Sequence, residues 1–257
     1  MKKLVDFSRA SSIRIGPRVE VELIDTIDSA FERYFLVGGA NNLLLSPTPP
    51  PLATLSKAFD YIRIDGDTLI VGAATPTGRV VSFCKRHDIA GFEFLARLPG
   101  TMGGAVKMNA GVKEYEIKDS LLWIRTHEGV IPASKLNLRY RQSDIQNIVY
   151  EMGFHFKKGY SEALRQRLLR LRSNQPKDPS AGSCFKNPPG DYAGRLIEAV
   201  GLKGKRVGDM AFSSMHANFL VNLGKGRFDE AMSLIEMAKK RVYEEFGIVL
   251  QEEIIIV

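Results

Sequence analysis

A glycine-dense stretch in the first half of the chain constrains the fold more than any other feature. The segment LARLPGTMGGAVKMNAG, Leu95–Gly111, holds Gly100, Gly103, Gly104 and Gly111, which makes an ordinary helix or strand a poor expectation here. It is not a P-loop, since the Lys-Ser/Thr pair is missing, and its glycine spacing is not that of a Rossmann fingerprint. Backbone lying against a flat or diphosphate-bearing cofactor would explain the glycines, because side chains would block the approach. A plain loop explains them equally well.

A second stretch, LVGGANNLL at Leu36–Leu44, stops a β-type run at Gly38 and Gly39 and then passes through two asparagines. Consecutive amide N–H groups in such a turn can form a nest that binds an anion. Gly-Gly and Asn pairs are also ordinary hairpin chemistry. The residues alone favour the hairpin.

A third stretch, AGSCFKNP at 181–188, places Ser183 beside Cys184, Lys186 and Asn187. The serine could be a nucleophile, a phosphate ligand, a proton donor or a turn former. The G-x-S-x-G spacing of a nucleophile elbow is absent, and the candidate histidines are isolated in sequence, which disfavours a hydrolase. A positioned hydroxyl can also donate a proton when charged groups stabilise the anion that receives it.

Hydrophobic periodicity predicts an α+β protein, rich in strands before Ser161 and richer in helices after it. Gly201 and Gly247 are candidate C-caps of two of the helices. The proline cluster SPTPPP at Ser46–Pro51 predicts a stiff loop, and Ser173–Gly182 a connection. The expected strands are Val19–Ile24, Tyr34–Val37, Tyr61–Ile64, Thr68–Ala73, Leu121–Thr126, Ile148–Lys158 and Ile248–Val257, and the expected helices are Thr77–Asp88, Tyr192–Val200 and Asp229–Phe246.

Charge and composition narrow the classes of function. Lys and Arg number 36 against 29 Asp and Glu, so anionic small molecules and nucleic acid are both possible partners. The densest basic run, Ser161–Lys177, has leucines at helical spacing and no interleaved aromatics, which favours a solvated helix face over nucleic-acid binding. Cys84 and Cys184 form neither a disulfide framework nor a metal-ligand pattern, so two reduced, buried thiols and no metal are expected. No stretch approaches the ~20 apolar residues of a membrane span, and a cytoplasmic location is expected.

Taken in chain order, these stretches resemble the UDP-N-acetylenolpyruvoylglucosamine reductases, flavoenzymes of bacterial peptidoglycan precursor synthesis. VGGANNLL looks like their first flavin-phosphate loop, GFEFLARLPGTMGGAVKMNAG like their second flavin motif, and LRYRQS at Leu138–Ser143 like their tyrosine-arginine segment. The resemblance implies non-covalent FAD in a fold of the vanillyl-alcohol oxidase type, reduced by NADPH and reoxidised by the enolpyruvyl ether of a UDP-sugar. It implies FAD-binding regions at 1–56 and 57–172, the latter joined by the C-terminal strand 248–257, and a substrate domain at 173–247.

Position in these motifs implies roles for individual residues. Ser183 would protonate the enolate, with Arg141 and Glu253 supplying the electrostatic and acid components. A guanidinium stays charged and can bind a carboxylate with two hydrogen bonds, and Lys186 is a candidate to stabilise the serine alkoxide. Substrate contacts are implied for Tyr140, Gln175, Lys186, Asn187 and His216. Cofactor contacts are implied for Gly38, Gly39, Ala40, Asn41, Asn42, Leu43, Pro99, Gly100, Thr101, Gly103, Gly104, Asn109 and Gly111.

The chain departs from the family pattern at a few places. Ala40 and Asn41 stand where the family has Gly and Ser, and Val112-Lys113-Glu114 replaces Ala-Tyr-Gly, with Tyr115 shifted. The short interval from Arg141 to Ser183 indicates the compact family type without an extra tyrosine lid. Motif spacing favours Glu253 over Glu252, which strand alternation would send to the opposite face.

Two other functions stay open from the sequence. One is a related flavin oxidoreductase with another acidic substrate, and the other is a basic nucleotide- or RNA-binding module. Bound flavin would separate an enzyme from a module, whereas salt-sensitive binding of arbitrary RNA would favour the module. The oligomeric state is open, with a monomer favoured.

Overall fold

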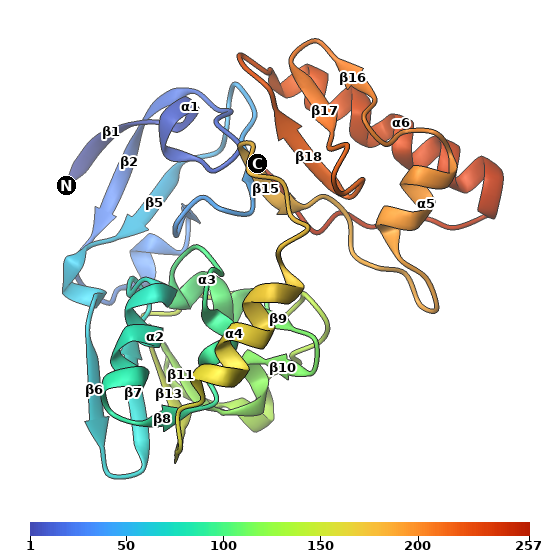
Figure 1. Ribbon diagram of the computed structural model, residues 1–257. Coiled ribbons are helices and arrows are strands. Elements are labelled where there is room, and N and C mark those ends of the chain that lie inside the picture. Colours follow the sequence, from blue (N-terminus) through green and yellow to red (C-terminus); the bar gives the residue numbers. More distant parts are fainter. The chain divides into compact units, whose positions relative to one another are not determined.

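The computed structural model describes residues 1–257 and divides into two compact units, each assembled from separate parts of the chain (Figure 1). Unit 1 comprises Met1–Lys3, Val21–Gly39 and Pro51–Ser173, and unit 2 comprises Leu4–Glu20, Ala40–Pro50 and Asn174–Val257. Both mix helices with strands, which confirms the α+β class. The division into three regions at 56 and 172 stays a prediction. None of the helices combines the length and the apolar character needed to cross a membrane.

Unit 1 is centred on an antiparallel sheet in the order β12-β11-β13-β7-β6. Alternate residues such as Met152 and Phe154 of β13 pack in one core with Val80 and Cys84, which lie one turn apart on α2. The predicted helix from Thr77 and the strand Leu121–Thr126 are confirmed. The elements are β6 (Ile62–Asp65), β7 (Thr68–Gly72), α2 (Thr77–Arg86), β8 (Ile89–Ala90), α3 (Met102–Lys107), β9 (Gly111–Val112), β10 (Tyr115–Glu116), β11 (Leu121–Thr126), β12 (Gly129–Pro132), β13 (Glu151–His155), β14 (Lys157–Lys158) and α4 (Glu162–Leu171).

A second set of strands in unit 1 runs in parallel. β5 (Leu52–Leu55) pairs with Val21–Ile24 of β2 (Arg18–Ile24) and with β3 (Phe35–Leu36). Ile24, Ala53 and Tyr150 are buried together beneath these strands. The proline cluster leads directly into β5 as the predicted loop.

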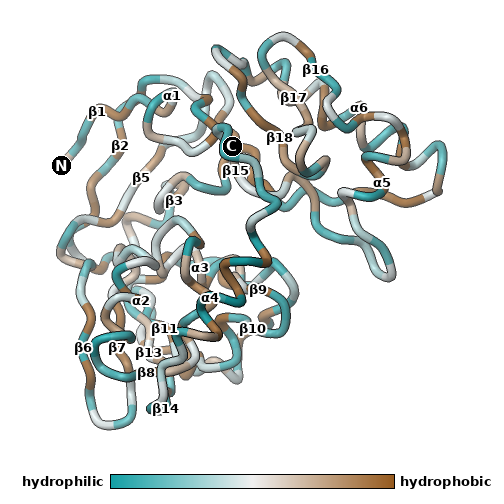
Figure 2. The backbone as a smooth tube through the Cα atoms, viewed as in Figure 1, coloured by the Kyte–Doolittle hydropathy of each residue, from teal (hydrophilic) through white to brown (hydrophobic).

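Unit 2 contains an antiparallel sheet in the order β15-β18-β17-β16, packed with helices α5 and α6. β18 is largely brown in Figure 2, in keeping with its buried side chains. The elements are α1 (Phe7–Ala10), β4 (Leu43–Leu44), β15 (Ser180–Ser183), α5 (Ala193–Ala199), β16 (Arg206–Val207), β17 (Met210–Phe212), β18 (Phe219–Asn222), α6 (Phe228–Phe246) and β19 (Ile255–Ile256), while β1 (Lys2–Asp6) precedes α1.

Helix α6 follows its sequence pattern closely. Ala231, Leu234, Ile235, Ala238 and Val242 are buried, at the spacing of one helix face. Gly247 ends the helix at φ 67°, a left-handed conformation that glycine adopts without a Cβ penalty, so the predicted C-cap is confirmed. Cys84 and Cys184 are free and buried, as expected.

Several predicted elements are wrong in extent. The last strand is confined to Ile255–Ile256, because the carbonyl of Cys184 accepts both the Glu253 N–H and the Ile254 N–H and interrupts a regular ladder. The expected strand Ile148–Lys158 breaks into β13 and β14, which pair with different partners. The glycine-dense stretch contains the helix α3, and the small-residue stretch before Cys184 forms β15.

Candidate active site

The two glycine stretches meet inside unit 1. A Cβ on Gly38 would lie 2.6 Å from the Oγ1 of Thr101, so a larger residue here would force the Thr101 side chain or the loop to shift. Thr101 is the N-cap of α3, and its Oγ1 accepts a hydrogen bond from the Gly104 N–H at 3.4 Å. Gly38, Gly39 and Gly104 are exposed, which leaves their backbone open to a ligand.

The first stretch is not a hairpin, and that preferred interpretation is wrong. β3 pairs with β5, whereas β4 pairs in parallel with β19, the last strand of the chain. Between the two strands, Ala40 has φ 50°, a left-handed conformation, and its carbonyl accepts a hydrogen bond from the Ser12 N–H at 3.1 Å. The Asn41 side chain donates to the Ser12 hydroxyl. The stretch is therefore a connection between separate strand pairs, held by hydrogen bonds rather than by a ladder.

Other glycines of the second stretch have packing reasons. Gly103 donates its N–H to the Ala73 carbonyl at 2.9 Å, and a Cβ there would lie 3.0 Å from the Ala73 Cβ. A Cβ on Gly111 would lie 2.4 Å from the carbonyl oxygen of Tyr115 in the β9–β10 pair. Lys113, at φ 57°, lies in the turn between those strands. Close packing therefore accounts for part of the glycine density that the sequence suggested a cofactor would explain.

The Asn109 side chain is committed to other protein groups. It is 0% exposed, and its Nδ2 donates to the Glu116 carboxylate and to the Arg139 carbonyl, each at 3.1 Å. Its Oδ1 accepts from the Lys118 N–H at 3.0 Å. Both N–H groups of the amide are thus used inside the protein. Asn109 joins the second glycine stretch to the segment that carries Arg141.

Arg141 lies in a tight turn docked on the second glycine stretch. Arg139 and Gln142 exchange backbone hydrogen bonds of 2.9 and 3.2 Å around it. Arg141 has φ 53°, a left-handed conformation that is uncommon outside glycine and clusters at functional sites. Its Nη2 donates to the Gly111 carbonyl at 2.7 Å, and its Nη1 lies 3.9 Å from Glu116. The turn therefore fixes one guanidinium beside the glycines.

Positive charge gathers around this guanidinium. Burial lowers the pKa of Arg172, and the neighbouring charges of Arg141 and Arg97 lower it further. The Arg141 Cζ lies 4.8 Å from the centre of the Tyr140 ring, which is itself 44% exposed. Like charges held close together favour an anion among them. This part of unit 1 is suited to a carboxylate or phosphate.

In unit 2 the backbone of Glu253 is hydrogen-bonded to Cys184, the residue that follows Ser183. Ser183, half-buried at the end of β15, pairs with Phe219 of β18 after a bulge that includes Gly182 at φ 82°. The carbonyl of the next residue, Cys184, accepts the Glu253 N–H at 2.9 Å. The Glu253 carbonyl in turn accepts from the Asn42 side chain at 3.0 Å. Burial, reinforced by Glu252 and Glu253, raises the pKa of the Cys184 thiol well above its ordinary value, which keeps this cysteine neutral.

The Glu252 carboxylate and the Glu253 backbone have different partners. The Glu252 carboxylate forms an ion pair with Lys239 of α6 at 2.9 Å, and this contact raises the pKa of Lys239. Glu252 is thus tied to the helix, while the backbone of Glu253 is tied to Cys184 and Asn42. The choice of Glu253 as the acid stays a prediction.

The remaining predicted substrate residues in unit 2 have structural partners as well. The Asn187 Oδ1 accepts from the first N–H of α5, on Ala193, at 3.1 Å. The His216 Nδ1 accepts from the Asn218 N–H at 3.3 Å, and burial lowers the pKa of His216. Lys186 donates its N–H to the Gln251 carbonyl at 2.8 Å. The half-buried Gln175 belongs to the segment that opens this part of unit 2.

The predicted residues therefore divide between the units. Unit 1 carries Gly38, Gly39, Pro99, Gly100, Thr101, Gly103, Gly104, Asn109, Gly111, Tyr140 and Arg141, and unit 2 carries Ala40, Asn41, Asn42, Leu43, Gln175, Ser183, Lys186, Asn187, His216 and Glu253. Sequence reasoning missed two residues, Glu116 and Asn218, whose side chains hold segments that carry predicted site residues. Glu116 contacts both Asn109 and Arg141, and Asn218 binds the backbone of Phe185. No local spacing distinguishes either residue from an ordinary turn or strand residue.

An α+β fold with exposed glycine loops and a docked arginine beside gathered positive charge is suited to an anionic ligand. Residues 175–257 match the family model described as UDP-N-acetylenolpyruvoylglucosamine reductase, C-terminal domain. The chain is 47% identical to the UDP-N-acetylenolpyruvoylglucosamine reductase of Helicobacter hepaticus, over 98% of this chain and 97% of that one. It is 43% identical to that of Campylobacter jejuni strain RM1221, over 99% of this chain and 100% of the relative.

A solved structure agrees with these sequence relatives. The crystal structure of UDP-N-acetylenolpyruvylglucosamine reductase from Thermus caldophilus superposes with a TM-score of 0.86 at 33% identity, covering 100% of this chain and 98% of that one. The chain belongs to the UDP-N-acetylenolpyruvoylglucosamine reductase family, a family of oxidoreductases. The resemblance seen in the sequence is thereby confirmed.

Proposed function

We propose that this protein is an NADPH-dependent FAD enzyme that reduces UDP-N-acetylglucosamine enolpyruvate to UDP-N-acetylmuramate in the cytoplasm. The observation that carries the proposal is the hydrogen bond of 2.7 Å from Arg141 to the Gly111 carbonyl. It joins a fixed cation to the stretch of backbone that the family resemblance assigns to the flavin. The flavin fold of the vanillyl-alcohol oxidase type is part of the same proposal.

The exposed glycines of unit 1 suit a flavin because they have no side chains. Gly38, Gly39 and Gly104 are exposed and have no Cβ, so a flat ring or a diphosphate can lie against their backbone. Thr101 and Gly38 would form the wall between the two loops. Asn109 would act through Arg139 and Glu116, because its amide N–H groups are already used. When bound, the flavin supplies the hydride that is added to the methylene carbon of the enolpyruvyl group.

The protein's own side chains complete the reduction. Adding a hydride to the carbon–carbon double bond leaves an electron pair on the neighbouring carbon, delocalised into the carboxylate. Arg141 would stabilise this charge, since its guanidinium stays protonated and can bind both carboxylate oxygens. Ser183 would then donate its hydroxyl proton to that carbon, with Lys186 stabilising the resulting alkoxide and Glu253 acting as the acid of the site. One hydride and one proton thus saturate the double bond.

Two half-reactions test this assignment. We expect Ser183→Ala to keep its flavin and to be reduced by NADPH at the parent rate. Its reoxidation by the enolpyruvyl nucleotide should slow by about 10²–10⁴-fold, the contribution of a positioned proton donor. Ser214→Ala, an exposed serine of the same unit, is the matched control and should behave as the parent. Equal reoxidation rates in Ser183→Ala and the parent would remove Ser183 from the mechanism, and a protein without flavin would remove the function.

A further inference from the structure

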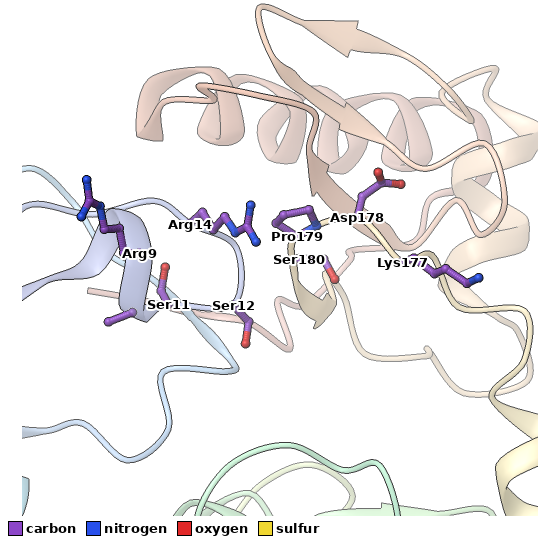
Figure 3. A pocket seen from close by; sticks show the side chains of 9 residues that line it. Arg9, Ser11, Ser12, Arg14, Lys177, Asp178, Pro179 and Ser180 are labelled. Atoms are coloured by element: carbon purple, nitrogen blue, oxygen red, sulfur yellow. The ribbon is translucent and has the colours of Figure 1, made fainter.

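A polar cavity in unit 2 lies outside every residue assigned to the reaction. Its volume is about 490 Å³, and it is an open hollow on the surface, not an enclosed pocket. Its lining comes from two segments, Arg9–Ser12 with Arg14, and Lys177–Ser180 (Figure 3). The lining carries three cations against the single carboxylate of Asp178, together with three serine hydroxyls. Such a lining suits an anion with several acceptor oxygens and disfavours an apolar ligand.

Among the cations of the lining, Arg14 has a backbone that several hydrogen bonds hold in place. Its φ of 57° is left-handed, which costs free energy for a residue with a Cβ. The backbone is held there by Asn222, whose buried side-chain amide donates to the Ile13 carbonyl at 3.0 Å and to the Arg14 carbonyl at 3.4 Å. The Arg14 N–H donates to the Ser11 carbonyl at 3.1 Å. Buried Ile13 and Ile15 on either side anchor the turn in the core.

The Arg14 side chain has no partner of its own. Its guanidinium forms no ion pair or hydrogen bond with another residue, and in Figure 3 it extends toward Pro179. The charged ends of Arg9 and Lys177 point away from it in the same view, so these two cations belong to the rim. A strained turn that presents one unpaired guanidinium to a cavity is the arrangement of a ligand clamp.

Ser12 links the cavity to the first glycine stretch. Its hydroxyl accepts a hydrogen bond from the Asn41 side chain, and its own O–H is left to donate. The Ser11 hydroxyl, by contrast, is occupied by the Phe7 and Ile15 carbonyls at 2.8 and 3.1 Å. The donors that remain in the lining are therefore the Arg14 guanidinium and the Ser12 and Ser180 hydroxyls.

We infer that this cavity binds a phosphoryl group, anchored by Arg14 and assisted by Ser12 and Ser180. The group could be free phosphate or diphosphate, or the diphosphate of a nucleotide. The inference goes beyond the proposed reaction and does not depend on it, because binding can be measured without turnover. The Asp178 carboxylate repels the anion, so removing the charge of Asp178 should strengthen binding and removing the charge of Arg14 should weaken it.

Calorimetric titration of the purified protein with pyrophosphate tests the site. We expect Arg14→Gln to weaken binding by about ten- to a hundredfold, the loss of a charge-assisted contact. Arg18→Gln removes the same charge from an exposed position of unit 2 outside the cavity and should bind as the parent. Asp178→Asn should bind about two- to tenfold more tightly, a gain that damage to the fold cannot produce. Urea unfolding of each variant checks that the fold is retained.

Competition assigns the source of the phosphoryl group. Displacement of pyrophosphate by UDP or NADP⁺ would assign the site to a nucleotide, and displacement by inorganic phosphate alone would assign it to the free anion. Loss of bound flavin in Arg14→Gln would assign it to the flavin's diphosphate. No pyrophosphate binding by the parent together with full retention of flavin by Arg14→Gln, or equal binding by the parent, Arg14→Gln and Asp178→Asn, would overturn the inference.

Discussion

Glu116 orients the Arg141 guanidinium, and replacing it with glutamine isolates that role. The side chains of Glu116 and Arg141 are only 13% and 17% exposed, and their charged atoms lie 3.9 Å apart. Glu116 also accepts from Asn109 at 3.1 Å and forms an ion pair with Lys118 at 2.8 Å. Glutamine has nearly the same shape and keeps an acceptor for Asn109, so Glu116→Gln removes chiefly the charge.

The size of the effect follows from these contacts. Lys118 is 45% exposed, so its ion pair contributes little. The interaction between the partly buried Glu116 charge and Arg141 contributes more free energy. At 3.9 Å it is weaker than a full charge-assisted hydrogen bond, so the expected loss is about 1–2 kcal/mol. That corresponds to about a 5- to 30-fold slower reduction of the enolpyruvyl double bond, in which Arg141 would stabilise the developing charge. Arg141 keeps its charge, so what is lost is its orientation.

Rapid-mixing absorbance of the flavin separates orientation from folding. We expect Glu116→Gln to be reduced by NADPH at the parent rate and to be reoxidised by the enolpyruvyl nucleotide about 5- to 30-fold more slowly. Glu114→Gln is the matched control, because Glu114 is 64% exposed and pairs only with the exposed Arg167 at 3.4 Å. Reoxidation at or above the parent rate, or equal slowing of both half-reactions, would refute the reasoning.

Two further predictions concern unit 2. Asn218 is buried, and its side-chain amide binds the Phe185 N–H and carbonyl at 2.9 and 2.8 Å. Asn218→Ala should therefore lower the free energy of unfolding, measured by urea titration, by about 2–4 kcal/mol. A loss below about 1 kcal/mol would contradict this prediction. Burial lowers the pKa of His216, so the unfolded chain binds its proton at a higher pH than the folded protein does, and stability should fall as pH drops below about 6.5. His216→Gln should lose this share of the decline between pH 7.5 and 5, and an identical decline in variant and parent would count against it.

Local patterns in the sequence were sufficient to predict several helices and strands. Helix α6 has an apolar residue at every helical turn and a glycine at its end, and α2 and β11 are equally regular. The order of the glycine, Tyr140–Arg141 and Ser183 motifs was also sufficient to identify the family. Helix and strand patterns depend on residues a few positions apart, and motifs depend on the order of residue types along the chain. A sequence contains both kinds of information directly.

Tertiary structure alone decided what the motifs do to one another. β4 pairs with β19 at the far end of the chain, so Gly38-Gly39 is a crossing between strand pairs although its residues fit a hairpin. Asn109 contacts Glu116 and Arg139 instead of presenting its amide to a ligand, and Arg14 is unpaired beside Lys177–Ser180. Such contacts join residues far apart in sequence, and local propensity contains no information on them because their free energy comes from packing and pairing in the folded chain.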